Sequence, residues 1–391
     1  MAGVPLSVLD LVPIPSGSTA TDALRNSIDL ARHAERLGYR RYWFAEHHLN
    51  PGVAGTSPPV VLALVAAATD HIRLGAGAVQ MGHRTGLSVV EEFGLIDALH
   101  PGRLDLGLGR SAGRPTTAPP APAAVAPGPV APGPVAPAPL AAATVTNGQT
   151  ANGLRIPARF SPANLLGLPR FALTRMLLQQ PNAKAPEYSG QVADILALLR
   201  GDYRSPDGVE AHVVPGEGAE IEVWILGSSG GESAQVAGAN ALRFAASYHV
   251  SPATVLEAVT GYRAAFHPSA ELPRPYVAVS ADVVVADDDA TARELATGYG
   301  LWVRSIRTGS GAIQFPTPAE ARTHQWTDED RTLVEDRLET QFVGSPATVA
   351  DQLTQLRDAT NADELIITTI THDHADRVRS YQLLAEEWAN R

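Results

Sequence analysis

The sequence predicts an α/β protein built as a closed (β/α)8 TIM barrel. Eight apolar runs of strand length recur along the 391 residues, and most are followed by a segment with helical periodicity. The runs are continuously apolar, as expected of parallel strands buried on both faces. Eight units in one chain favour a closed barrel over an open sheet, and the pattern G-x-G-x-x-G of open dinucleotide-binding sheets is missing after the first strand. We therefore expect a single domain over residues 1–391.

Four strand-helix units fill about the first 110 residues. Their apolar runs end in glycine, proline or polar residues, which marks the boundaries. The strands are expected at 6–12, 39–45, 72–79 and 103–109, with helices at about 21–37, 58–69 and 87–99.

The same order resumes near residue 221. Ser345 has the features of a helix N-cap, because proline follows it at the first helical position and an amphipathic run continues to Arg357. The remaining strands are expected at 221–227, 241–247, 276–286 and 362–370, with helices from about 231, at 252–266, over much of 288–340 and at 373–388.

A long irregular segment, about 111–185, separates the fourth strand from the next helix. Its centre, 115–143, is dominated by proline and alanine and carries no charge. Proline at this density prevents a regular helix and favours extended conformations. The segment is either a surface insertion without a role or, because it starts at the C-terminal end of a barrel strand, a cover for the pocket there.

Composition excludes several classes of function. The chain has no cysteine, which removes disulfides, thiolate nucleophiles, zinc-thiolate sites and iron-sulfur clusters. The formal net charge is −11 and the basic residues are scattered, so no basic stripe is available for nucleic acid. Neither a secretory signal nor a run of 18 apolar residues is present, so we expect a cytoplasmic protein that does not bind a membrane.

The functional residues of a barrel lie just past the C-terminal ends of its strands. The first expected strand ends at Asp10, the second at Glu46, His47 and His48, and the third at Gly77 and Ala78. The fourth ends at Gly109 and Arg110, the fifth at the stretch 227–233, and the eighth at 371–376.

The stretch "GSSGG" after the fifth strand is suited to a phosphate group. Its glycines permit close backbone approach, Ser228 and Ser229 supply hydroxyl donors, and the following helix offers unpaired N–H groups. A simpler interpretation is a flexible turn that caps a helix. Arg110, at the end of the neighbouring strand, favours the phosphate interpretation because a guanidinium binds phosphate with two hydrogen bonds.

The adjacent pair His47 and His48 has three interpretations. A shared metal ion is disfavoured, because adjacent residues on an extended chain point to opposite sides. Both imidazoles would otherwise be structural, or one would face the pocket as a proton donor or acceptor near neutral pH.

A second pair, His372 and His374, follows the eighth strand. Two-residue spacing on an extended chain would place both on one side, where they would contact a ligand or, less plausibly, a metal ion. Asp373 between them is explained more simply as the cap of the last helix.

The stretches "GYRRYWFAEHH", "IRLGAGAVQM", "EEFGLIDALHPGRLDLGLGRSAG" and "WILGSSGGESAQVAG" together resemble the bacterial luciferase-like, flavin-dependent monooxygenases. The resemblance covers the first 115 residues closely and the rest in the order of its elements. It implies a (β/α)8 barrel that binds reduced FMN at the C-terminal mouth. A separate reductase would supply the FMN, and O2 and a small organic substrate would react with it. A homodimer is expected on the same ground.

Carried onto this chain, the resemblance assigns roles to individual residues. His47 matches the histidine that acts beside the flavin, and Gly77 and Ala78 match the pair that meets the flavin ring through a cis peptide. Arg110 matches the arginine of the FMN phosphate, and Ser228, Ser229 and Gly230 match the phosphate loop. Luciferase itself has a reactive cysteine where this chain has Gly109, so light emission is not implied. Asp10 and His372, and with them the substrate, remain unassigned.

Two alternatives stay open at this point. The same phosphate loop would serve the deazaflavin F420 in an oxidoreductase that transfers hydride without activating O2. The chain would otherwise be a flavin-binding barrel without turnover. No metal site is expected in any of these interpretations.

Overall fold

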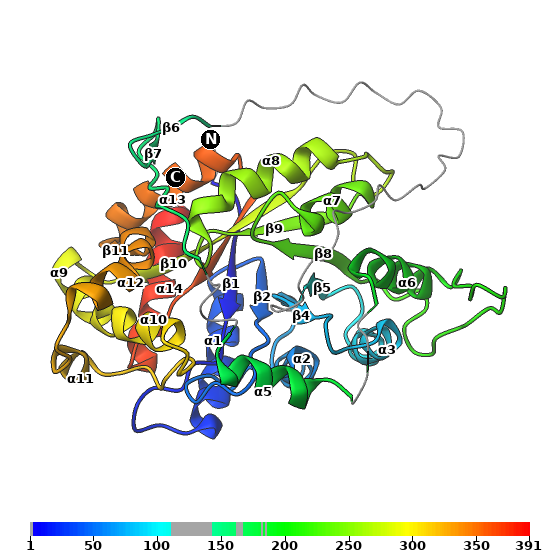
Figure 1. Ribbon diagram of the computed structural model, residues 1–391, viewed down its shortest axis with the longest axis horizontal. Helices are drawn as coiled ribbons and strands as arrows, with labels where there is room; N and C mark the ends of the chain where they lie inside the picture. Colours follow the sequence, from blue (N-terminus) through cyan, green and yellow to red (C-terminus); the bar gives the residue numbers. More distant parts are fainter. Residues whose placement is uncertain (1–2, 111–142, 162–166, 181–182, 184–185) are drawn as a thin grey trace.

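The computed structural model describes residues 3–110, 143–161, 167–180, 183 and 186–391, and its centre is a closed barrel of parallel strands (Figure 1). The ladder runs β12–β1–β2–β3–β5–β8–β9–β10, and β10 also pairs with β12, which closes the ring. The predicted (β/α)8 barrel is therefore confirmed. Its strands are β1 (Leu6–Asp10), β2 (Arg41–Phe44), β3 (Arg73–Ala76), β5 (Leu104–Gly109), β8 (Glu222–Gly227), β9 (Arg243–Ser247), β10 (Val277–Val285) and β12 (Glu364–Thr368).

The strands are apolar throughout because both of their faces are buried. On β1, Leu6 and Val8 belong to the cluster that packs against the surrounding helices, whereas Leu9 packs with Trp43 inside the barrel. Two short strands extend the sheet: β4 (Val79–Gln80) pairs with β5, and β11 (Phe342–Gly344) pairs with β10.

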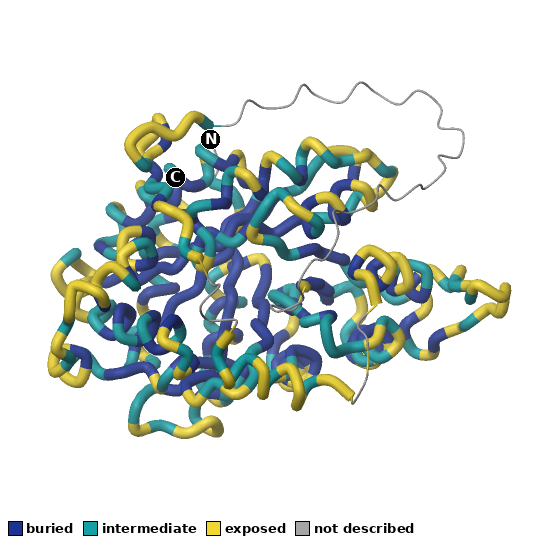
Figure 2. Tube along the Cα trace, in the orientation of Figure 1, coloured by how far each residue is buried: buried dark blue, intermediate teal, exposed yellow. Residues whose placement is uncertain are grey.

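The helices that follow the strands surround the barrel, and each buries apolar residues against it (Figure 2). The predicted caps are present, since Ser345 accepts from the N–H of Thr348 and Asp373 accepts from that of Ala375. The helices that follow individual strands are α1 (Ala20–Arg36), α2 (Pro58–Ala66), α3 (Gly86–Asp97), α6 (Tyr188–Arg200), α7 (Glu232–Ala239), α8 (Val255–Ala265), α13 (Pro346–Thr360) and α14 (His374–Trp388). No helix of the described residues combines the length and apolar character needed to cross a bilayer.

Four more helices lie between β10 and α13 and form a lobe beside the barrel, yellow to orange in Figure 1. Tyr299, Trp302 and Val334 of this lobe pack with the residues that fill the barrel interior. The lobe therefore extends the core past the ends of the strands. Its helices are α9 (Asp289–Leu295), α10 (Tyr299–Arg307), α11 (Pro318–Arg322) and α12 (Asp328–Thr340).

The N-terminal end of the barrel is filled by a network of buried charges. Nη1 of Arg41 lies 2.8 Å from a carboxylate oxygen of Asp105 and 2.9 Å from one of Glu222, and Nε lies 3.0 Å from Glu364. Burial opposes the charged form of Arg41, but these carboxylates keep its pKa well above its usual range. The paired charges stabilise the fold at the end of the barrel where active sites are not found.

The described parts of the predicted insertion, 111–185, contact the C-terminal end of the barrel. The hydroxyl of Tyr248, just after β9, donates to the carbonyl of Arg155 at 2.7 Å. Arg170 of α5 (Pro169–Leu178) donates to Oδ1 of Asn50, just after β2, at 3.1 Å. These contacts place insertion residues over part of the C-terminal end of the barrel. The interpretation of the insertion as a cover for the pocket requires such a position. Residues 115–142 of the proline-rich stretch lie outside the described residues.

Candidate active site

The C-terminal ends of the strands, which we call the mouth, bring together residues that are far apart in sequence. His47 follows β2, the Gly77–Ala78 pair follows β3, and Arg110 follows β5. The loop 228–231 follows β8, the strand that pairs with β5. The structure thus places at one end of the barrel each predicted site residue: His47, Gly77, Ala78, Arg110, Ser228, Ser229 and Gly230.

Glu46 is the centre of a buried hydrogen-bond network beside the mouth. Its Oε1 accepts from Nε2 of His48 at 2.9 Å and from Nε2 of His83 at 3.0 Å, and its Oε2 accepts from the backbone N–H of Gln80 at 2.9 Å. Burial opposes ionisation, but these hydrogen bonds lower the pKa of Glu46 to about 2. The carboxylate is therefore charged at neutral pH and fixes both histidines.

The geometry alone would allow a metal ion here, because one potential ligand atom from each of Glu46, His48 and His83 lies close to the other two. Nε of Arg84 lies 3.4 Å from Oε1 of Glu46, the oxygen that both histidines contact. A fixed positive charge at that position opposes a divalent cation. The arrangement is explained as a hydrogen-bonded support for the chain after β2.

His47 takes no part in this network. Its side chain is only partly exposed, and its Nδ1 is buried with no hydrogen-bond partner among the described residues. Burial, and to a lesser extent the neighbouring His48, lower the pKa of His47 to about 4. His47 is therefore a neutral imidazole at neutral pH, and its buried Nδ1 is left without a hydrogen-bond partner among the described residues.

The Gly77–Ala78 peptide is cis, as the resemblance implied. Both residues are partly exposed, and a Cβ at Gly109 on the adjacent strand would lie 2.9 Å from Cβ of Ala78. The absence of a side chain at position 109 keeps this stretch of backbone uncovered. The partly exposed backbone at Gly77–Ala78 is thus left uncovered by the adjacent strand at the mouth.

Arg110 lies beside the loop 228–231. Its Nη1 is 2.7 Å from Oε2 of Glu232, the first residue of α7, and its side chain is 38% exposed. The backbone N–H of Gly230 donates to Oε1 of Glu257 at 3.2 Å. A Cβ at Gly230 would lie 3.0 Å from the carbonyl oxygen of Glu257, so the loop needs glycine to approach α8.

These groups fit a phosphate in type and position. The guanidinium of Arg110, the hydroxyls of Ser228 and Ser229 and the N-terminus of α7 are the donors that bind phosphates in proteins. Two carboxylates already lie at this site: Glu232 pairs with Arg110, and Glu257 accepts from the backbone N–H of Gly230 in the same loop. An entering phosphate would replace them, because like charges repel.

His249, which follows β9, is a mouth residue that the sequence analysis did not identify. Its Nδ1 lies 2.6 Å from Oγ of Ser280 and 3.3 Å from Oγ of Ser247. Burial lowers the pKa of His249 to about 4; the negative charge of Asp282 opposes this shift, and Arg337 and His47 add to it. The expected sixth strand, 241–247, ends two residues before this histidine. Listing the residues after that strand, as was done for the other strands, would have identified His249.

Other polar residues near the strand ends are structural. Asp10 accepts hydrogen bonds from Arg377 of α14 at 2.8 Å and from the hydroxyl of Tyr42, so it faces the helices and not the mouth. His372 contacts the backbone carbonyl of Ser16, whereas His374 contacts Asp29 of α1 at 2.9 Å. The expectation that His372 and His374 face one side is therefore wrong, because His374 has entered the helix that Asp373 caps.

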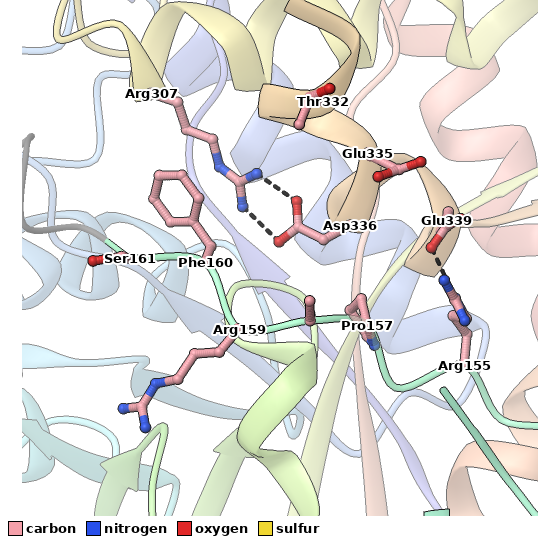
Figure 3. A pocket seen from close by; sticks show the side chains of 11 residues that line it. Arg155, Pro157, Arg159, Phe160, Ser161, Arg307, Thr332, Glu335, Asp336 and Glu339 are labelled. Carbon is pink, nitrogen blue, oxygen red and sulfur yellow. Dashed lines mark hydrogen bonds and ion pairs between the residues drawn. The ribbon is translucent and has the colours of Figure 1, made fainter. Parts of the chain in front are cut away.

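A cavity of about 300 Å³ lies between residues 155–161 of the insertion and helices α10 and α12 (Figure 3). Arg307 stacks over the ring of Phe160 at 4.0 Å and contacts Asp336, and Arg155 contacts Glu339 at 2.8 Å. None of the predicted site residues lines it. The contacts in its walls attach the insertion to α10 and α12.

A model of the family described as luciferase-like monooxygenase matches residues 4–120 and 186–362. The chain belongs to this family. It is 33% identical over 382 residues to the luciferase-like monooxygenase of Escherichia coli strain K12, covering 97% of this chain and 96% of that protein. Among solved structures it is similar to apo-MsnO8, with a TM-score of 0.74 and 31% identity over 99% of this chain and 98% of that one.

Two solved structures of lower sequence identity share the fold. The oxygenating constituent of 3,6-diketocamphane monooxygenase from Pseudomonas putida, solved with FMN, has a TM-score of 0.64 and 16% identity over 99% of both chains. An F420-dependent secondary alcohol dehydrogenase has a TM-score of 0.58 and 12% identity over 99% of both chains. The same fold thus occurs in one protein solved with FMN and in another described as F420-dependent.

Proposed function

We propose that the protein is an FMN-dependent monooxygenase that oxidises a small organic substrate with reduced FMN and O2. The observation that carries this proposal is the meeting of three groups at one mouth. A neutral His47 with an unpartnered ring nitrogen and the partly exposed cis Gly77–Ala78 backbone lie at the same end of the barrel as Arg110, which is beside the double-serine loop. These groups suit a ligand with a planar ring system and an anionic tail.

Each part of the chain would have a separate task in this reaction. Arg110, Ser228, Ser229 and the N-terminus of α7 would bind the FMN phosphate, and the backbone at Gly77–Ala78 would support the ring. Bound reduced flavin supplies the electrons that activate O2. The apolar interior below the mouth and the insertion residues above it would exclude water, which protects reactive species in such sites.

His47 would hold or accept a proton beside the ring system. Its low pKa keeps the imidazole neutral at neutral pH, so it can act as a hydrogen-bond donor or as a base. Glu46 would act indirectly, because it fixes His48 and the chain next to His47.

The proposal includes a flavin reductase as partner and a homodimer as the assembly. Exposed apolar side chains on the adjacent helices α2 and α3 support the dimer, since such patches often mark interfaces. They are Val60 and Leu64 of α2, Leu95 of α3 and Leu99 just past the end of α3, exposed by 50–79%. Light scattering should give twice the chain mass for the natural chain and the mass of one chain for the double variant Leu64→Lys, Leu95→Lys. A double variant with the same mass as the natural chain would contradict a dimer through this face.

The cofactor is tested by anaerobic titration with reduced FMN and, separately, with reduced F420, followed by admission of air. We expect reduced FMN to bind and its reoxidation kinetics to change in the presence of the protein. Selective binding of F420 without an effect on the reaction with O2 would replace the proposal by hydride transfer. Binding of neither cofactor would contradict both.

A further inference from the structure

Half of the mouth carries polar groups to which the proposed flavin site assigns no role. In the ring of eight strands, three strands separate β2 from β9 in each direction. His47, which follows β2, and His249, which follows β9, therefore lie on opposite sides of the mouth. One half, on β3, β5 and β8, carries the residues assigned to FMN. The other half, on β10, β12 and β1, begins at His249 and includes Ser280 and Thr368.

The hydrogen bonds of His249 determine which ring nitrogen is available. Nδ1 of His249 lies 2.6 Å from Oγ of Ser280, and when the single hydroxyl hydrogen of Ser280 is donated to the carbonyl of Ala246 at 3.4 Å, Oγ accepts from Nδ1. Nδ1 then carries the proton of the neutral ring, and Nε2 is left as an acceptor. No hydrogen bond to Nε2 joins it to the residues that the structure describes, and the side chain is partly exposed.

A second observation comes from Thr368 at the end of β12. Thr368 pairs in register with Asp282 of β10, on the same face as Ser280. It is 1% exposed, and its Oγ1 has no partner among the described residues. A buried hydroxyl without a partner is costly, which indicates that a ligand or water normally satisfies it.

This wall is electrically neutral. The carboxylate of Asp282 is paired with Nη2 of Arg337 at 2.9 Å and bonded to the hydroxyl of Tyr299. His249 stays unprotonated near neutral pH, as described above. The wall therefore favours an uncharged molecule over an ion.

We propose that His249, held by Ser280, and Thr368 form the substrate wall of the mouth. Nε2 of His249 accepts a hydrogen bond from an O–H or N–H group of an uncharged organic substrate. This inference rests on the proposed function, because it takes the opposite half of the mouth as the flavin half.

The wall is tested by chemical modification with diethyl pyrocarbonate, which attacks unprotonated imidazole nitrogens that it can reach. Peptide mass spectrometry of the apoprotein at about pH 6, where an ordinary histidine is largely protonated, should show modification of both His47 and His249. Saturating FMN should slow modification of His47 by about tenfold or more and that of His249 by less than about twofold, because a bound ligand buries most of its contacts. His249→Gln is the control for the assignment of the modified peptide.

Two outcomes overturn the inference. His249 would be unreactive in the apoprotein if Nε2 did not face the mouth, and it would be protected by FMN together with His47 if it belonged to the flavin half. Failure of FMN to bind at all would instead contradict the proposed function. The expected hydrogen bond is tested in the FMN-loaded protein with cyclohexanol and benzyl alcohol, which should slow modification of His249 more than their methyl ethers do; equal effects would contradict the substrate class.

Discussion

The two ends of the barrel treat polar groups in opposite ways. At the N-terminal end, Arg41 contacts three carboxylates and Arg73 contacts Asp105 at 2.7 Å, so each of these charges has an opposite charge beside it, although Nη2 of Arg41 makes no hydrogen bond to the described residues. At the mouth, Nδ1 of His47 and the hydroxyl of Thr368 are neutral groups with no partner among the described residues. Removing one partner of a buried ion pair is expensive, whereas an unpaired neutral group can be completed by a ligand. One barrel thus separates the groups that hold it together from those that bind.

The largest expected effect is on stability. Arg41→Ala leaves Asp105, Glu222 and Glu364 without their shared cation, and we expect the free energy of unfolding to fall by about 3–5 kcal/mol, as for other broken buried pairs. Urea denaturation followed by circular dichroism measures it. His249→Gln is the matched control at the mouth and should lose far less. Equal losses of unfolding free energy in the two variants would contradict the view that the N-terminal end stabilises the barrel more than the mouth does.

The next effect is on catalysis. His47→Ala should reduce turnover by about 10²-fold or more, because a positioned acid-base group contributes this much. FMN binding and the urea midpoint should change little, since the ring makes no structural hydrogen bond through Nδ1. The same measurement separates an enzyme from a flavin-binding barrel without turnover. A variant that keeps turnover within about threefold would show that His47 is not the catalytic group.

The mouth also makes stability depend on pH. His47 and His249 have pKa values of about 4 in the folded chain, below the value of about 6.5 for an unfolded histidine. As pH falls from about 6.5 towards 4, the unfolded chain takes up these protons first, so each histidine lowers stability by about 1–3 kcal/mol. We expect the unfolding free energy of His249→Gln to decrease less steeply over this range than that of the natural chain. Parallel curves would mean that His249 titrates normally.

The smallest effect concerns the carboxylate that pairs with Arg110. Glu232→Gln removes a negative charge 2.7 Å from the guanidinium and should tighten FMN binding by about threefold to tenfold, since an exposed ion pair contributes about 1 kcal/mol. Glu210→Gln, an exposed site on another loop, is the control. Weaker binding in Glu232→Gln would show that this carboxylate supports the phosphate site instead of competing for it.

The barrel and its mouth followed from local patterns. Continuous apolar runs predict buried parallel strands, and the strand ends then predict which residues meet. The caps at Ser345 and Asp373 were predictable for the same reason, because a capping interaction involves residues only two or three positions apart.

Partners that are distant in sequence were not predictable. Asp10 was a candidate for the mouth because it ends β1, but its partner Arg377 lies 367 residues away and turns it towards the helices. His83 contacts Glu46 because the chain from β4 onward passes beside the end of β2, 37 residues earlier in the sequence. The two carboxylates at the phosphate loop likewise come from α7 and α8, and only the folded chain brings them beside Arg110 and Gly230.

The most direct test of the central claim is the dissociation constant of reduced FMN, measured under nitrogen by equilibrium dialysis for the natural chain, Arg110→Ala and the exposed control Arg200→Ala. Loss of a charge-assisted hydrogen bond to phosphate should weaken binding by about tenfold to a hundredfold in Arg110→Ala and leave Arg200→Ala unchanged. Riboflavin, which lacks the phosphate, should bind the natural chain and Arg110→Ala with equal affinity. An FMN dissociation constant that is the same in all three proteins would contradict the account.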